Sequence, residues 1–128
     1  MPTSRQRLAL LAATLMLAGA PRFAAAADCA LALVHAAAVV DHGRRAVAGR
    51  DYVEASNLAS NARLPALDAA QQAKACGCPE AVPLLAEAAR DATRVNSAFN
   101  LTAAQQYAAD IAKHGQAAVD ALLRCAKR

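Results

Sequence analysis

The sequence predicts an all-α protein: a four-helix up-down bundle of two antiparallel helical hairpins, each stapled by a disulfide. Two observations indicate this fold. Small and apolar residues recur at alternating spacings of four and three along residues 28–128, which is the period of a buried helix face. The four cysteines are placed symmetrically, because Cys29 lies 47 positions before Cys76 and Cys125 lies 47 positions after Cys78. No pair of alternating apolar runs joined by a hairpin turn occurs.

The first 27 residues are typical of a secretory signal peptide. Arg5 and Arg7 supply a basic start, residues 8–19 form an apolar core, and the alanines at 25–27 offer a cleavage site. The apolar run is shorter than the roughly 20 residues that span a bilayer. We therefore expect cleavage, a periplasmic or secreted protein, and no stable membrane insertion afterwards.

The remaining residues, 28–128, are predicted to form one all-helical domain, with hairpins over residues 28–76 and 78–128. The whole chain has 14 basic and 10 acidic residues, and loss of three arginines with the signal leaves 11 against 10, a net charge of +1. The two signs are interspersed, so a nucleic-acid partner is not supported. Abundant alanine and few aromatic residues bury little apolar area, which makes cross-links valuable.

The first helix is expected over residues 28–48, with Asp28 as its N-cap. Gly49 follows, at a position where helix ends favour a residue that tolerates positive φ. The face predicted to meet the core carries Cys29, Leu33, Ala36, Val40, Gly43 and Val47.

The second helix is expected over residues 51–75, because Asp51 can cap its first turn and Glu54 can reach back in a variant of the capping box. Its predicted core face is a stripe of small residues, Ala55, Ala59, Ala62, Ala66, Ala69, Ala73 and Cys76. Pro65 lies within this segment, lacks an amide hydrogen and clashes with the preceding turn. We therefore expect a kink or break at Pro65, so that the second helix could be two.

The second hairpin repeats this arrangement. Its first helix is expected from Pro79, well placed at a first helical position, to about Val95. Thr102 and Gln105 match a capping box and predict the start of its second helix. The predicted core positions are Cys78, Val82, Leu85, Ala89 and Ala92, followed by Ala104, Ala108, Ile111, Gly115, Ala118, Leu122 and Cys125.

In an up-down bundle the four cysteines gather at one end. Pairing Cys29 with Cys76 and Cys78 with Cys125 would staple each hairpin, although the pairs Cys29–Cys78 and Cys76–Cys125 remain open. Closing a loop of this length stabilises a fold by about 4 kcal/mol on the chain-entropy account. A four-thiolate zinc site or a redox centre is the alternative, but the spacing lacks both the zinc knuckle and C-x-x-C.

Four other residues form the alternative metal-ligand set. His35 and His42, seven apart, share a face of the first helix, and Asp110 and His114 have the i, i+4 spacing that presents two ligands on one helix face. Without a metal, we expect a partly buried His114 and two surface histidines. The other carboxylates are predicted to be solvated.

The sequence contains no nucleophile elbow, S-x-x-K, P-loop or dinucleotide-binding fingerprint. We therefore expect neither enzymatic activity nor a cofactor. The leading hypothesis is an exported, non-enzymatic binding or structural module for a protein partner. The alternative hypothesis is a periplasmic protein that handles metal or thiol redox chemistry through the clustered cysteines or the histidines.

The mass of the exported protein tests these expectations together. We expect a chain that starts at Asp28 and has no thiol open to alkylation, because oxidising compartments favour disulfides. Non-reducing peptide mapping should return Cys29–Cys76 and Cys78–Cys125. Alkylatable thiols, or zinc released by alkylation, would instead make the cysteines the functional site.

Overall fold

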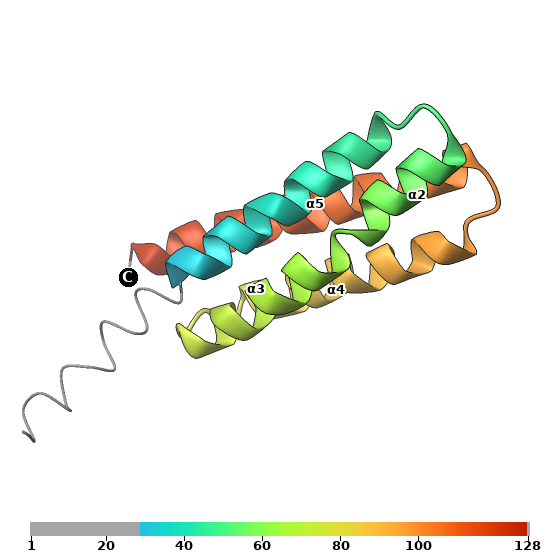
Figure 1. Ribbon diagram of the computed structural model, residues 1–128. Coiled ribbons are helices and arrows are strands. Elements are labelled where there is room, and N and C mark those ends of the chain that lie inside the picture. The colour runs from blue at the N-terminus through green and yellow to red at the C-terminus, as the bar shows by residue number, and fades with distance from the viewer. Residues whose placement is uncertain (1–28, 128) are drawn as a thin grey trace, which may run out of the picture.

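The computed structural model describes residues 29–127, and their regular structure is entirely helical (Figure 1). A first helix covers residues 29–47. It is followed by α2 (Tyr52–Ser60), α3 (Arg63–Ala75), α4 (Ala81–Arg94), the short 3₁₀ helix η1 (Val95–Ser97) and α5 (Leu101–Ala126). The predicted signal peptide and the Asp28 cap lie outside the described residues. The all-helical fold class is confirmed.

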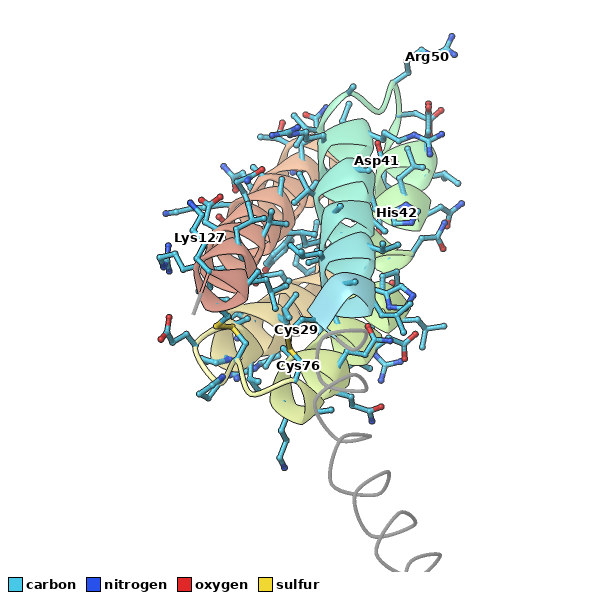
Figure 2. All side chains as sticks on the ribbon, turned by 90° about the vertical axis from the view of Figure 1, so that its left-hand side faces the viewer. Cys29, Asp41, His42, Arg50, Cys76 and Lys127 are labelled. Carbon is cyan, nitrogen blue, oxygen red and sulfur yellow. A yellow bond between two sulfur atoms is a disulfide. The ribbon has the colours of Figure 1, made fainter. Side chains whose placement is uncertain are left out.

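The helices lie side by side along a common long axis (Figure 1). The connections at residues 48–51 and 98–100 lie at one end, which we name the loop pole, and the turn between α3 and α4 lies at the other. α4 packs against both α3 and α5, and α2 packs against α5. Figure 2 shows Cys29 and Cys76 at the end opposite Arg50. We name this second end the disulfide pole.

Two disulfides close the disulfide pole. Cys29 is bonded to Cys76 with a Cα–Cα distance of 5.2 Å, and Cys78 is bonded to Cys125 with a distance of 5.8 Å. No cysteine among residues 29–127 is free. The predicted disulfides are therefore present, in the pairing that joins the two ends of each hairpin.

A Schellman motif at the end of α3 produces the turn between the two disulfides. Gly77 has a φ of +78°, the left-handed conformation that glycine adopts without a steric penalty. The Cys78 amide donates to the Ala73 carbonyl at 2.8 Å, and the Gly77 amide donates to the Lys74 carbonyl at 3.3 Å. The chain thereby reverses within two residues, which directs the cysteines on either side of Gly77 to different partners.

The prolines lie next to helix starts. The interruption between α2 and α3 falls at Asn61 and Ala62, one turn before Pro65, which is in the first turn of α3. In a continuous helix the proline ring would clash with the carbonyl of Asn61, four residues earlier. The missing amide hydrogen costs no hydrogen bond, because amides in the first turn of a helix have no partner within the helix. Pro79 precedes α4, which begins two residues later than expected, at Ala81.

The cap predicted for α2 is confirmed. The Asp51 carboxylate accepts from the Glu54 amide at 2.9 Å, and the Glu54 carboxylate accepts from the Arg50 amide at 3.2 Å. Glu54 thus reaches back one residue further than in a standard capping box, in which the N3 side chain accepts from the amide of the N-cap itself.

The cap predicted for α5 is wrong. Asn100, not Thr102, precedes the helix in an extended conformation, and its side chain accepts from the Ala103 amide at 2.8 Å. Gln105 is consequently free for another contact. Its Nε2 donates to the carbonyls of Val47 at 3.0 Å and Gly49 at 3.3 Å, and so caps the end of the first helix from α5.

Alanine makes up most of the core. The predicted small-residue stripe of the second helix is buried from α2 to α3, at Ala55, Ala59, Ala62, Ala66, Ala69 and Ala73, each 0% exposed, whereas Cys76 at its end is only partly buried. The first helix departs from its predicted face, because Val47 is 42% exposed and Ala46 is buried instead. Its buried face is rotated toward Ala32 and Val39, since this helix contacts α5 as well as its own hairpin partner.

Glycines allow the first helix to approach its neighbours closely. A Cβ atom at Gly43 would lie 2.8 Å from the Ala112 amide nitrogen, and one at Gly115 would lie 3.0 Å from Val39 Cγ1. Gly49 is also a position where a side chain would not fit. Its φ is not positive, so the expectation of a left-handed residue there is wrong. The space that a side chain at Gly49 would need is taken by Ala55.

Substitution of Gly43 by alanine tests the close approach of the first helix to α5, because the change in the free energy of unfolding has opposite signs with and without that approach. In a solvated helix interior this change stabilises by roughly 1 kcal/mol. Here we expect a loss of about 1–3 kcal/mol, because the new methyl group meets the backbone of α5. Urea unfolding measures the difference, and Ala37→Gly at an exposed position of the same helix gives the propensity baseline. A more stable Gly43→Ala variant would contradict the packing.

Candidate functional site

The disulfide pole offers no thiolate. All four predicted site cysteines are oxidised, and Cys78 is 0% exposed. Metal binding and nucleophilic exchange both require the thiolate form. In this state Cys29, Cys76, Cys78 and Cys125 cross-link the scaffold.

The two histidines of the first helix are half-buried, so the expectation of surface histidines is wrong. His35 donates from Nδ1 to Gln72 Oε1 on α3 at 2.8 Å. His42 has a buried Nδ1 without a hydrogen-bond partner, and the same holds for the hydroxyl of Ser56 on α2. The His35 contact therefore joins the first helix to α3.

His114 is half-buried, as expected, but it does not join Asp110 in a ligand set. Its Nδ1 lies 3.0 Å from Asp91 Oδ2 on α4, whereas Asp110 is exposed. Across residues 29–127, no group of three or more His, Cys, Asp or Glu side chains is placed to hold a metal ion. The alternative site of His35, His42, Asp110 and His114 is thus not assembled.

Asp91 is the residue that the sequence interpretation missed. Asp91 is 3% exposed, and among the described residues it is the one charged side chain that is buried. The expectation of a solvated carboxylate is therefore wrong for Asp91. His114 donates to one of its oxygens, and Arg94 Nη1 donates to the other at 3.2 Å. Arg94 three positions after Asp91 was a signal for an ion pair. The burial depends on α5 and has no signal in the sequence.

The Asp91–His114 contact joins α4 and α5. Because a carboxylate only accepts, His114 carries its hydrogen on Nδ1. Among the described residues no hydroxyl or thiol hydrogen-bonds to the ring, so the nucleophile of a triad is missing. The contact therefore fixes how α4 and α5 sit against each other.

The loop pole carries exposed apolar side chains. Phe99 is 98% exposed, Val53 64%, Val47 42% and Tyr52 37%, and we name these four the apolar loop cluster. Their chain segments are held together, because Gln105 bonds to the carbonyls at the end of the first helix. Phe99 lies two residues before the start of α5, in the 98–100 connection at the same pole. The cluster thus combines both connections of that end (Figure 1).

Phe99 is exposed at a position where a helix normally buries an apolar residue. It precedes the N-cap Asn100, and an apolar residue there usually packs on the fourth helical residue as a hydrophobic staple. That residue is Ala104, which is 0% exposed and covered by the core. The ring therefore lacks its usual intramolecular contact and projects into solvent.

No protein-family model, curated protein or solved structure matches this chain. Within residues 29–127, no helix combines the length and the apolar character needed to cross a membrane.

Truncation of His114 tests the buried contact. We expect His114→Ala to lower the free energy of unfolding by about 1.5–3 kcal/mol, since Asp91 loses a charge-assisted hydrogen bond inside the protein. The matched control is His35→Ala, which is also half-buried but bonds to a neutral amide, and about 0.5–1.5 kcal/mol is expected there. Thermal unfolding of both variants gives the comparison. Equal losses would show that the carboxylate adds nothing.

Proposed function

We propose that this chain is a small exported binding module without catalytic activity, and that it contacts a protein partner through the apolar loop cluster. The observation that carries the proposal is the 98% exposure of Phe99 at a helix start where such a side chain is ordinarily packed. Removing a phenylalanine from water stabilises by about 1.5–3 kcal/mol. An exposed ring in a defined position thus suits an interface anchor, the role in which aromatic side chains dominate binding energy.

The proposal includes the up-down arrangement of the two hairpins. In it the disulfides hold the helix ends at one pole and leave the opposite pole for contact. The two cross-links each remove chain entropy from the unfolded state, by about 4 kcal/mol on the chain-entropy account. A scaffold constrained in this way loses little freedom on binding, which favours affinity.

Export is also part of the proposal. The two disulfides are compatible with an oxidising compartment, and a periplasmic or secreted location follows from the predicted signal peptide. The metal- or redox-handling alternative has less support, because His35 and His114 bond to separate partners and the cysteines are paired with each other.

Photo-crosslinking in cells that export the protein tests the binding surface. A photoreactive phenylalanine analogue in place of Phe99 should give a discrete adduct, because the ring is expected to lie inside the interface. The same analogue at Leu64 is the matched control, since this α3 residue is 66% exposed but belongs to no cluster at the loop pole. The Phe99 adduct should weaken when Val53 is replaced by serine. No adduct at 99, or equal adducts at both positions, would contradict the proposal.

A further inference from the structure

We propose that the partner of the apolar loop cluster is a second copy of this chain, joined pole to pole about a two-fold axis. The inference rests on the proposed function and names its partner. It follows from how apolar and charged side chains are distributed over the loop pole.

The loop pole has the composition of an interface that can pair with itself. The exposed side chains of Phe99, Val53, Val47 and Tyr52 form its apolar part. Charges of both signs border them, with Arg50 next to Asp51 in the connection and Glu54 in the first turn of α2. An apolar centre with a charged rim is the usual anatomy of a protein interface.

Two-fold symmetry makes opposite charges on one surface complementary. In such a dimer, if residue i of one copy contacts residue j of the other, the reverse contact also forms. Arg50 of each copy can therefore face Asp51 and Glu54 of the other, giving the same favourable contact twice. A surface with one sign of charge would repel its own copy.

The charged groups at this pole are available for the contact. The Arg50 guanidinium makes no ion pair with any residue of the 29–127 segment, and Figure 2 shows this side chain extended from the loop pole away from the helices. Asp51 and Glu54 each use one carboxylate oxygen for the α2 cap, Oδ1 and Oε2 respectively. The second oxygen of each carboxylate is left for a cation.

A lipid surface fits this pole less well than a second copy does. Anionic membranes attract clusters of Lys and Arg near the apolar contact. At the loop pole Arg50 stands beside the carboxylates of Asp51 and Glu54. Arg45 lines the same surface hollow as Arg50 and Glu54 but forms an ion pair with Asp41 at 3.6 Å, so these groups carry no positive excess. The near balance of charges favours a protein surface with the same balance, and this chain supplies one.

The expected dimer is reversible. Each copy offers four exposed apolar side chains at this pole, far fewer than the roughly 20–30 residues that each side contributes to a standard interface. The two-fold contact also closes on itself, so association stops at two copies. Monomer and dimer should therefore exchange with protein concentration.

Sedimentation equilibrium of the exported chain, with both disulfides formed, measures this exchange over a series of concentrations. Phe99→Ser should raise the dimer dissociation constant by about tenfold or more, because each dimer loses two buried rings. Leu64→Ser, at a comparably exposed α3 position, should leave the constant unchanged. Monomers at every concentration, or equal effects of the two variants, overturn the inference.

A charge exchange tests the two-fold pairing independently. Arg50→Glu and Glu54→Arg should each weaken self-association, and a mixture of the two variants should form a mixed dimer more tightly than either variant pairs with itself. Circular dichroism establishes that both variants keep their helices. A mixture no tighter than its components contradicts the pairing of Arg50 with the acidic rim.

The adduct formed at position 99 separates this inference from the proposed function. An adduct of two copies of the chain supports both. An adduct with a different protein or with lipid, combined with a monomer in sedimentation, overturns the second-copy partner, and a different protein leaves the binding function standing. Absence of any adduct overturns both.

Discussion

A core built from alanine and glycine constrains the rest of this molecule. Alanine removes little apolar area from water, so each buried position contributes less to stability than leucine would. Small side chains also bring helix backbones close together. At Gly43 the remaining space is too small for a single methyl group. Few large apolar side chains are fully buried, among them Leu85, Ile111 and Leu122. The hydrophobic contribution is therefore modest for a domain of this size.

The two disulfides compensate for the modest hydrophobic contribution by destabilising the unfolded state. Each joins the ends of one hairpin, and the Gly77 turn connects the two cross-links within a single residue. Cross-linking lowers the entropy of the unfolded chain without requiring more buried area. Because both bonds lie at one pole, the opposite pole is held by packing and hydrogen bonds alone. This end also presents the exposed apolar side chains. The cross-linked disulfide pole and the exposed loop pole are therefore at opposite ends of the long axis.

Polar contacts between helices specify the axial position of each helix, which faces lined with alanine specify only weakly. A stripe of similar small residues specifies axial position weakly, because shifting one helix by a turn meets nearly the same surface. Asp91 with His114, His35 with Gln72, and Gln105 with the end of the first helix each join a different helix pair. We infer that these bonds fix the relative height of the helices. A buried polar contact that selects one arrangement over others is an attested use of such groups.

Much of the local structure could be read from the sequence. The 4-3 repeat predicts which residues of α2, α3 and α5 are buried, because a helix face is a local property of spacing. The Asp51 cap depends on residues close in the chain, and the presence of disulfides follows from the symmetric spacing of the cysteines. The α5 start was misplaced because Thr102 and Asn100 both suit a cap, and the contact of Gln105 with the first helix decides between them.

The sequence by itself determined the helical class and the buried stripes of α2, α3 and α5, since periodicity is set by neighbours along the backbone. Only the tertiary structure decided which cysteines pair, that Asp91 is buried, that His35 and His114 bond to separate partners, and that Phe99 is exposed at the loop pole. Each of these depends on the rotation and height of one helix against another. Those are set by contacts between residues far apart in the chain, such as Gly43 with Ala112, which no local pattern encodes.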